Sequence, residues 1–404
     1  MKEYKEKGAR KYDVAIGGYF CVDLIPRLKD NKSLTDIFKI LRPGKLTEID
    51  GMDAELGGVV ANTGIALKRF TKNVFLNGLI GDDLIGKTAM EKLSYFNLPL
   101  EGIKTLKGGE TAFSLVIAPN GVDRIFLESP GCNQLFDNSF VNFEAISKSK
   151  IFHFGYPPLL KQFYLQDGNQ LLDMLSYIKE MGVITSMDFS LPDKDSESGN
   201  VNWSALLDRV LPFTDIFTPS LEEALQILNP LKYTKVQSIL GRKDILSLIP
   251  MATIRELGKR IIEAGAKITL IKAGHRGIYL RTGNISSLVD PLLLNLSEDH
   301  WNYREIWCQA YPAGQCEGKN ADGAGDIAVA AFLSSLLDGE DPESSLRYAA
   351  VVGRNKICQN NILDKLFDWD NITNQIWAMN NKVIDLKEPQ NNDWVDFNIS
   401  EIKL

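Results

Sequence analysis

Short apolar runs alternate with helical stretches along most of this chain, and this alternation constrains the fold more than any other feature. Apolar runs typical of buried strands lie at 12–17, 74–79, 150–155, 183–189, 215–218 and 268–273. Stretches with helical character lie between them, at 59–70, 171–181, 220–228 and 254–264. Strands separated by helices predict βαβ units, and therefore an α/β fold with a doubly wound, mostly parallel sheet flanked by helices.

One region interrupts this alternation with two neighbouring strands. The runs 111–118 and 122–128 are joined by Pro119-Asn120-Gly121, and Asn-Gly between two alternating apolar runs strongly indicates a β-hairpin. A hairpin inside a βαβ series often lies outside the main sheet as a flap. We therefore expect a small β lid that is built from about 24–55 and 108–128.

A second irregular region, 283–319, is long and has poor periodicity. We interpret it as an insertion whose aromatic residues must pack somewhere, namely Trp301, Tyr303, Trp307 and Tyr311. Large α/β folds often run well beyond ~150 residues as one domain, so the whole chain, 1–404, is expected to form a single α/β domain with its lid and this insertion.

The composition excludes some classes of protein. The formal net charge of −7 argues against a mainly electrostatic hold on nucleic acid or anionic lipid. No stretch approaches the ~20 apolar residues that a membrane-spanning helix needs. The charged N-terminus lacks the apolar core of a secretory signal. We therefore expect a cytoplasmic protein without a nucleic-acid or membrane partner.

The cysteines and histidines indicate no metal or disulfide framework. The cysteines lie at positions 21, 132, 308, 316 and 358, without CxxC spacing, and the histidines at 153, 275 and 300. This pattern argues against structural zinc and predicts buried thiols in a reducing compartment.

The sharpest local feature is the segment 320–326 (NADGAGD), which is followed at once by the apolar run IAVAAFLSSLL. Glycines allow a tight turn, and the helix after them presents unpaired N–H groups and a positive dipole end, which suit a phosphate. Asp326 at the helix start could be only an N-cap. Alternatively, it could be a general base that takes a proton from an attacking hydroxyl beside the phosphoryl group.

Two further features could contact a substrate. Gly57 and Gly58 open a helix that carries Asn62 one turn later, so the glycines could let a polyol approach the backbone while Asn62 bonds its hydroxyls. The alternative is an ordinary helix entry with a surface asparagine. Asp23 follows the first strand, where loops line the crevice of an open α/β sheet, although a lone aspartate there is more often a turn residue.

Taken in order, these motifs resemble the ribokinase-like PfkB family of carbohydrate kinases. The ordered set is Asp23, Gly57-Gly58 with Asn62, the 111–128 hairpin and the Gly323–Asp326 helix start. The segments 81–86 (GDDLIG), 219–223 (PSLEE) and 272–277 (KAGHRG) are similar to further motifs of that family. The resemblance spans roughly residues 12 to 360.

The resemblance implies an ATP- and Mg²⁺-dependent kinase that transfers the γ-phosphoryl group to a hydroxyl of a sugar or nucleoside. Asp326 would be the base, and the backbone of Gly323, Ala324 and Gly325 the anion hole. Substrate contacts would come from Asp23, Gly57, Gly58 and Asn62, with Arg124 and Asn133 as weaker candidates. Nucleotide contacts would come from Ser220, Glu223, Lys272, Gly274 and Gly277, with Glu223 also associated with the metal, directly or through water.

Departures from the family pattern keep an alternative open. Asn320-Ala321 replaces the usual Asp-Thr, which weakens the case for a monovalent-cation site, and Ser220 replaces the usual asparagine. A catalytically weak sugar- or nucleotide-binding protein is therefore the rival reading, against which the retained Asp326 argues. A homodimer through the lid is also left open. Dinucleotide-dependent oxidoreductases and P-loop NTPases are excluded because neither GxGxxG with its later acidic residue nor GxxxxGK[ST] occurs.

Overall fold

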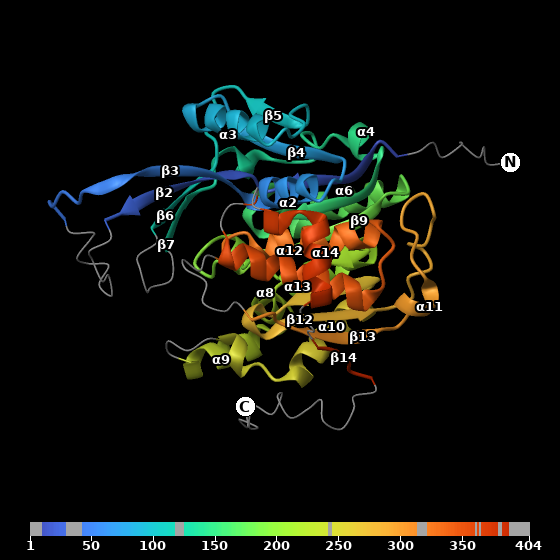
Figure 1. Ribbon diagram of the computed structural model, residues 1–404. Coiled ribbons are helices and arrows are strands. Elements are labelled where there is room, and N and C mark those ends of the chain that lie inside the picture. The colour runs from blue at the N-terminus through green and yellow to red at the C-terminus, as the bar shows by residue number, and fades with distance from the viewer. Residues whose placement is uncertain are drawn as a thin grey trace.

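The structure is a computed structural model that describes residues 10–29, 43–117, 125–240, 245–312, 321–359, 362, 365–378 and 382–387. Within these residues it contains a ten-stranded and a four-stranded sheet. Figure 1 shows the four-stranded sheet projecting to one side of the body that the larger sheet and its helices form.

The larger sheet is parallel over most of its width. Its strands follow the order β14-β13-β12-β11-β10-β9-β8-β1-β4-β5. From β5 to β11 every neighbouring pair is parallel, and the pairs from β11 to β14 are antiparallel. The strands are β1 (Tyr12–Gly18), β4 (Val74–Gly81), β5 (Ile103–Leu106), β8 (Ser149–Gly155), β9 (Ile184–Asp188), β10 (Ile216–Phe217), β11 (Ile268–Lys272), β12 (Gly277–Thr282), β13 (Glu305–Gln309) and β14 (Val383–Asp385). The mostly parallel sheet predicted from the sequence is confirmed.

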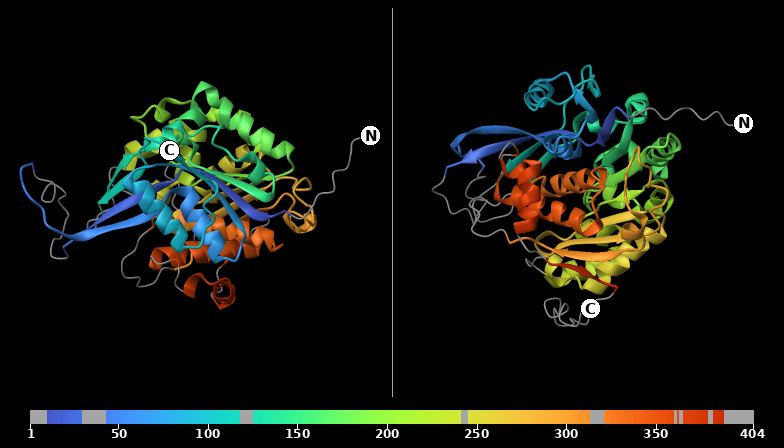
Figure 2. Two further views of the ribbon diagram at one scale, coloured as in Figure 1. Left: turned by 90° about the horizontal axis from the view of Figure 1, so that it is seen from above. Right: turned by 45° about the vertical axis from the view of Figure 1, so that its right-hand side comes forward.

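Helices cover both faces of this sheet, and each face has its own apolar core (Figure 2). One core contains residues of α2 (Gly58–Arg69), α3 (Leu84–Tyr95), α12 (Ala324–Leu337), α13 (Pro342–Cys358) and α14 (Trp369–Ala378). The other contains residues of α4 (Phe143–Ile146), α5 (Lys161–Tyr164), α6 (Asn169–Glu180), α7 (Trp203–Val210), α8 (Leu221–Leu228), α9 (Pro230–Leu240) and α10 (Met251–Glu263). Helix α12 is mostly apolar on all sides and is buried from Asp326 to Leu336, so Asp326 lies inside the protein while Ala324 and Gly325 before it are partly buried.

The four-stranded sheet combines both segments that were expected to form a lid. Its order is β3-β2-β6-β7, with β2 (Cys21–Leu28), β3 (Ile49–Gly57), β6 (Phe113–Ile117) and β7 (Ile125–Ser129). β6 and β7 pair antiparallel, as the Asn-Gly signal predicted, although the turn 119–121 lies outside the described residues. We call these four strands the lid sheet.

The order of the strands places a crevice beside β1. The chain moves from β1 to β4 on one side and later returns to β8 on the other, so the direction of winding reverses at β1. Ligands of open α/β sheets bind at the carboxyl ends of the strands at such a point. Here Gly155 ends β8 in tight contact with Val59 of α2, since a Cβ on Gly155 would lie 2.5 Å from the Val59 side chain. The first turn of α2 therefore packs directly on this crevice.

The irregular region 283–319 contains more structure than its sequence indicated. Residues 298–301 form α11 (Glu298–Trp301), and residues 305–309 form β13, which lies between β12 and β14 in the central sheet. Ile306, Trp307 and Cys308 are all buried, as in other strands of this sheet. The strand was missed because it follows a long irregular segment. Of its aromatic residues, Trp301, Trp307 and Tyr311 pack in the core, whereas Tyr303 is exposed.

The cysteines follow the expectation in part. Cys21, Cys132 and Cys308 are free and buried. Cys358 is in a disulfide, so the expectation of thiols throughout is wrong at this position. Spacing along the chain does not show which distant cysteines the fold brings together. Among the helices that the structure describes, none combines the length and the apolar character that crossing a membrane requires.

Candidate active site

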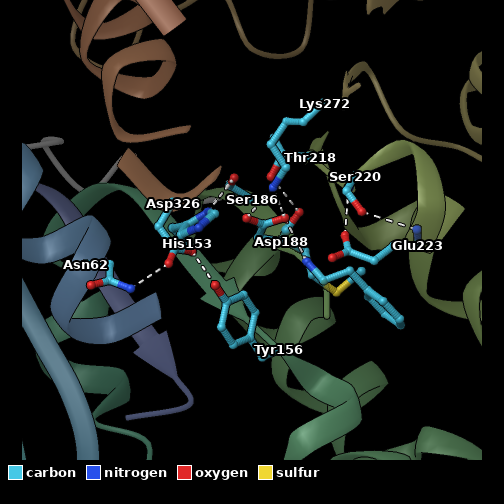
Figure 3. A network of polar contacts seen from close by, with 12 residues as sticks. Asn62, His153, Tyr156, Ser186, Asp188, Thr218, Ser220, Glu223, Lys272 and Asp326 are labelled. Atoms are coloured by element: carbon cyan, nitrogen blue, oxygen red, sulfur yellow. Dashed lines mark hydrogen bonds and ion pairs between the residues drawn. The ribbon is translucent and has the colours of Figure 1, made fainter. Parts of the chain in front are cut away.

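Polar side chains gather where the parallel strands end, facing the first turn of α12 (Figure 3). Tyr156 follows β8, Asp188 ends β9 and Lys272 ends β11. Asn62 approaches from α2, and Asp326 comes from α12. Carboxyl ends of parallel strands meet at one edge of a sheet, and this explains why residues more than 100 positions apart lie together.

Asp326 is not the cap of its helix. Helix α12 begins at Ala324, and its N-cap is Gly323, which makes no side-chain cap bond. Gly323 has a φ of +66°, and a Cβ there would lie 3.0 Å from Asn62 Nδ2, so glycine suits this position on both counts. Asp326 is the third helical residue and is 2% exposed. The capping interpretation of Asp326 is therefore wrong.

Both carboxylate oxygens of Asp326 accept a hydrogen bond. The Tyr156 hydroxyl donates to Oδ1 at 2.6 Å, and Asn62 Nδ2 donates to Oδ2 at 2.8 Å. Burial raises the pKa of Asp326 to about 6, and the charge of Asp188 adds to this, whereas the two donors and Lys272 oppose it. A buried carboxyl group whose pKa lies near neutrality is suited to accept a proton.

Asn62 was expected to leave its amide for a bound polyol. Its amide N–H instead donates to Asp326, so the buried amide already has a protein partner. Asn62 nevertheless lines the same cavity as Asp326.

Only some of the backbone amides at the start of α12 are available for the predicted anion hole. Ile327 N–H makes the first intrahelical bond, to the Gly323 carbonyl at 3.0 Å. The amides of Gly325 and Asp326 therefore precede the helical ladder. The Ala324 amide, by contrast, donates to the Ala321 carbonyl at 3.1 Å and is committed within the turn. A phosphate here would meet the later amides of this turn and the positive end of the helix dipole.

Lys272 brings a positive charge to the same place. A Cβ on Gly325 would lie 3.6 Å from Lys272 Nζ, so the ammonium lies beside the first turn of α12. Lys272 Nζ donates to both carboxylate oxygens of Asp188 at 2.8 Å, and the Asp188 side chain is 1% exposed. Burial would lower the pKa of Lys272, but Asp188 and Glu223 outweigh it and the pKa is raised. Lys272 therefore remains an ammonium ion beside the helix start.

Glu223 and Ser220 have a structural role that the sequence analysis did not assign. Ser220 N–H donates to Glu223 Oε2 at 2.7 Å, and Glu223 N–H donates to Ser220 Oγ at 3.2 Å, which is a capping box at the start of α8. Burial raises the pKa of Glu223 to about 7, opposed by Lys272 and assisted by Asp188. Ser-x-x-Glu before an apolar run is a known signature of this cap. The hydroxyl of Ser220 is thus used within the helix start.

A cavity of about 480 Å³ lies between the lid sheet and the start of α12. Its wall includes Asp23 and Glu55 of the lid sheet, Asn62 of α2, Tyr156 and Asp326. Its other lining residues include Lys92, Phe96, Phe126, Asp322 and Lys356. The cavity therefore has hydrogen-bonding groups at one end and aromatic and apolar surface elsewhere, which is typical of a small-molecule site.

Asp23 lies on strand β2 and not in a turn, as a lone aspartate would suggest. It pairs with Glu55 of β3 and Ser114 of β6. Burial raises its pKa to about 6; Glu55 and Glu128 add to this, while Cys21 and Ser114 oppose it by donating hydrogen bonds. The lid sheet thus presents a carboxyl group to the cavity opposite Asp326.

The two glycines before α2 are required by close packing. A Cβ on Gly57 would lie 2.5 Å from Asp23 Oδ2. Gly58 has a φ of +79°, and a Cβ there would lie 2.5 Å from the Tyr19 carbonyl oxygen. A larger residue at position 58 would therefore disturb the fold itself. A substitution such as Gly58→Val could not show whether a substrate approaches the backbone there.

The other candidate residues are placed apart from this cavity or outside the described residues. Asn133 is buried and donates to the Phe20 carbonyl at 2.9 Å, so it fastens the segment between β1 and β2. Gly274 and Gly277 follow β11 with φ of +55° and +125°. The backbone of β13 lies against Gly277, at Cys308. Arg124 and Asn320 lie outside the described residues.

The sequence analysis missed Tyr156, Asp188, Glu55, Lys92 and Lys356. A signal existed for Asp188, because an aspartate lies near the carboxyl end of the predicted strand 183–189, at the edge where ligands bind. Tyr156 gave a weaker signal, since it follows the glycine that ends β8. The remaining three lie on helices or lid strands whose faces only the packed structure reveals.

A doubly wound sheet with a separate lid, a buried carboxylate and a helix N-terminus facing one cavity defines a small-molecule enzyme of the α/β class. The comparison with protein families identifies which one. A model described as pfkB family carbohydrate kinase matches residues 18–293, more than half of the chain. The chain belongs to the pfkB family of carbohydrate kinases.

Curated relatives are plant proteins of this family. The chain is 28% identical to probable fructokinase-2 of Arabidopsis thaliana over 298 residues, which cover 73% of the chain and 76% of that protein. It is also 28% identical to probable fructokinase-6, chloroplastic, of the same plant, over 33% of the chain and 35% of that protein. In the second case the similarity spans about a third of the relative.

Solved structures with the same fold include two sugar kinases. An Arabidopsis thaliana ribokinase complexed with ribose and ATP superposes with a TM-score of 0.64 at 15% identity, covering 90% of this chain and 98% of the other. A fructokinase with bound ATP from Xylella fastidiosa gives a TM-score of 0.63 at 18% identity, with the same two coverages of 90% and 98%. At these identities the likeness confirms the ribokinase-like fold.

Proposed function

We propose that the protein is an ATP-dependent kinase that transfers the γ-phosphoryl group to a hydroxyl of a sugar or nucleoside. The observation that carries this proposal is the buried Asp326 carboxylate at the start of α12, facing a cavity that the lid sheet covers. A proton acceptor and an anion site lie within one helical turn, which is the combination that phosphoryl transfer to an alcohol needs.

Asp326 takes the proton of the acceptor hydroxyl as that oxygen attacks phosphorus. A pKa of about 6 keeps the carboxylate ionised at neutral pH while leaving it basic enough to accept a proton. The amides of Gly325 and Asp326 and the Lys272 ammonium stabilise the negative charge on the transferring group. The protein contributes mainly position and electrostatics, as is usual for phosphoryl transfer.

The residues around Lys272 fit a nucleotide that carries a magnesium ion. The carboxyl groups of Asp188, Glu223 and Asp326 surround a single ammonium, which leaves an excess of buried negative charge. Among the residues that the structure describes, no group of three or more His, Cys, Asp or Glu could hold a metal alone. Mg²⁺ in kinases is typically held by one or two carboxylates together with substrate phosphates, and Glu223 is our candidate. When bound, Mg²⁺ would neutralise charge on the phosphates.

The acceptor contacts Asp23, Asn62 and the backbone at Gly57 and Gly58. These residues belong to the lid sheet and to α2, which line the cavity. Closure of the lid sheet over the acceptor excludes water, which would otherwise compete for the phosphoryl group. Gly274 and Gly277, next to Lys272, lie on the nucleotide side. We further propose that the protein is cytoplasmic and has no nucleic-acid partner. A homodimer that forms through the lid sheets of two copies is a separate hypothesis.

The test is an ATP-consumption screen over sugars, sugar phosphates and nucleosides with Mg²⁺, followed by identification of the phosphorylated product. Asp326→Asn is the matched control for contaminating activity. The proposal predicts turnover with at least one acceptor and none above background in the variant. ATP consumption that is equal in the two proteins, or absent with every acceptor, would refute it.

The second candidate is a binding protein of the same fold with little catalysis. Two observations favour it: Ser220 is used in a capping box, and the Ala324 amide is committed to Ala321. This candidate predicts that sugars or nucleotides raise the melting temperature of the protein while no product forms in the same samples.

A further inference from the structure

Tyr156 is the residue of the site that the mechanism above does not use. Its hydroxyl donates to Asp326 Oδ1 at 2.6 Å, and its ring lines the cavity. Figure 3 shows it pointing from the end of β8 toward the Asp326 carboxylate. This bond lies directly on the group that we propose as the base.

The backbone of Tyr156 is held in an unfavourable conformation to make this contact. Its φ of 66° and ψ of 48° lie in the left-handed region, which a residue with a Cβ seldom adopts. Its N–H donates to the Asp188 carbonyl at 3.4 Å, and its carbonyl accepts from Leu159 N–H at 2.9 Å. The surroundings therefore fix the direction in which the side chain leaves the strand.

The donors on Asp326 leave room for one more partner. A carboxylate oxygen has two lone pairs, of which Tyr156 takes one on Oδ1 and Asn62 takes one on Oδ2. The carboxylate is thus held at both oxygens, and one lone pair on either oxygen can take the further partner. An acceptor hydroxyl in the cavity can donate to one of these without displacing either residue.

We propose that Tyr156 is a positioning residue for proton transfer: its hydroxyl orients the Asp326 carboxylate and holds it ionised for the acceptor hydroxyl. This inference rests on the proposed kinase function. Tyr156 does not itself carry the proton, because its own pKa is raised well above its ordinary value by burial and by the charge of Asp326.

Besides the hydrogen bond from Tyr156, several charged groups influence the pKa of Asp326, and they determine its value in a Tyr156 variant. Asp188 from β9 raises the pKa of Asp326, and Lys272 from β11 lowers it. Glu223 from α8 acts on Tyr156, and Asp322 lines the same cavity. Removing only the Tyr156 hydroxyl leaves these charges in place. Because a hydrogen bond to the ionised form is lost, the pKa of Asp326 should rise, by about one unit.

The experiment compares Tyr156→Phe with wild type and with Tyr279→Phe. Tyr279 is a matched control, because it is a buried tyrosine that, like the partly buried Tyr156, donates to a carboxylate, here Glu305 Oε1 at 2.8 Å, but it lies on β12. The assay is kcat and KM against pH, with the acceptor found in the screen. We expect Tyr156→Phe to lower kcat about tenfold at pH 7, about twofold from protonation of Asp326 and the rest from loss of its orientation. KM for ATP should be unchanged, and the acid limb should move up by about one pH unit.

A measurement without turnover separates this inference from the proposed function. In Tyr156→Phe the unfolding free energy should fall more steeply between pH 5 and 8 than in wild type, because the folded variant holds the Asp326 proton to higher pH. An unchanged acid limb with kcat within twofold of wild type, or an equal change in Tyr279→Phe, would overturn the role of Tyr156. Absence of turnover in wild type would instead refute the kinase, and a parallel pH dependence of stability would refute the coupling of Tyr156 to Asp326.

Discussion

Replacing Asp326 with asparagine separates catalysis from stability, because the two effects should have opposite signs. The substitution keeps the shape of the side chain and one acceptor oxygen for Tyr156 or Asn62, but it removes the proton acceptor. We expect kcat to fall by at least ~10²-fold, the usual scale for loss of a general base. We also expect the variant to be no less stable than wild type at pH 7.

The stability estimate comes from the burial of the carboxyl group. Its pKa rises from 3.8 to about 6 on folding, which corresponds to a cost of about 3 kcal/mol for carrying the charge at neutral pH. Asparagine avoids that cost and loses one charge-assisted hydrogen bond of about 2 kcal/mol. The net change is therefore about 1 kcal/mol in favour of the variant, or a melting temperature higher by about 1 °C.

The pH dependence of the unfolding free energy shows whether the Asp326 carboxylate stabilises or destabilises the fold, whatever the size of its contribution. The folded protein holds the Asp326 proton to higher pH than the unfolded chain does, so this group lowers the stability of wild type as pH rises from about 4 to about 7. Denaturant unfolding of both proteins across this range should show wild type losing about 3 kcal/mol relative to Asp326→Asn, with a constant difference above pH 7.

Two results would refute this reasoning about Asp326. The first is a kcat near the wild-type value in Asp326→Asn, which would mean that Asp326 is not the general base. The second is a loss of more than about 2 kcal/mol of stability at pH 7, which would mean that the carboxylate is a structural acceptor whose ionised form the fold requires.

The remaining predictions concern other groups of the site. Lys272→Met should raise KM for ATP at least tenfold and destabilise the protein by about 3 kcal/mol, because Asp188 loses its partner; adding Asp188→Asn should restore the stability and not the KM. Asp23→Asn should raise KM for the acceptor about tenfold in a steady-state assay and leave the thermal shift by ATP intact. Wild-type KM for the acceptor should also rise below pH 6 as Asp23 is protonated, and a KM independent of pH would contradict a contact through its charge. Ser220→Ala should lower stability by about 1 kcal/mol and leave KM for ATP within twofold of wild type, because Ser220 caps α8. A tenfold rise in KM for ATP would instead support the contact between Ser220 and the nucleotide.

The sequence predicted six of the central parallel strands because most of their residues are apolar and buried, whereas the short strand β5 (IKTL) carries two exposed residues and was not predicted. Strands β8 and β9 are buried along their length, so both stand out against their flanking helices. The hairpin of β6 and β7 was equally clear from Asn-Gly. Strand β13 was missed because it follows a long irregular segment and lacks the flanking helices that mark a βαβ unit.

The candidate site was predictable only where a residue type and a local pattern coincide. Asp326 stands directly behind glycines and before an apolar helix, so its place followed from the sequence. Its partner Tyr156 did not, because the contact depends on a left-handed backbone after the end of β8 and on where α12 packs relative to that strand end. The bond from Asn62 to Asp326 joins residues 264 positions apart, and no local pattern encodes such a pair.

The connection between the two sheets has a practical consequence for redesign. The chain leaves the central sheet after β1, forms β2 and β3 of the lid sheet, and packs on the central sheet again with α2. The two ends of this segment lie side by side, because Cys21 pairs with Gly57. The arm between them, β2 to β3, is therefore closed at a narrow neck, with Val60 N–H donating to the Tyr19 carbonyl at 3.3 Å just inside it. Exchanging residues 22–56 for the arm of a relative needs to preserve this neck and the pairing of β2 with β6. Closing the chain itself costs little, because its ends already meet. If the lid sheet contacts the acceptor as we propose, such an exchange should change acceptor preference and leave Asp326 and the start of α12 in place.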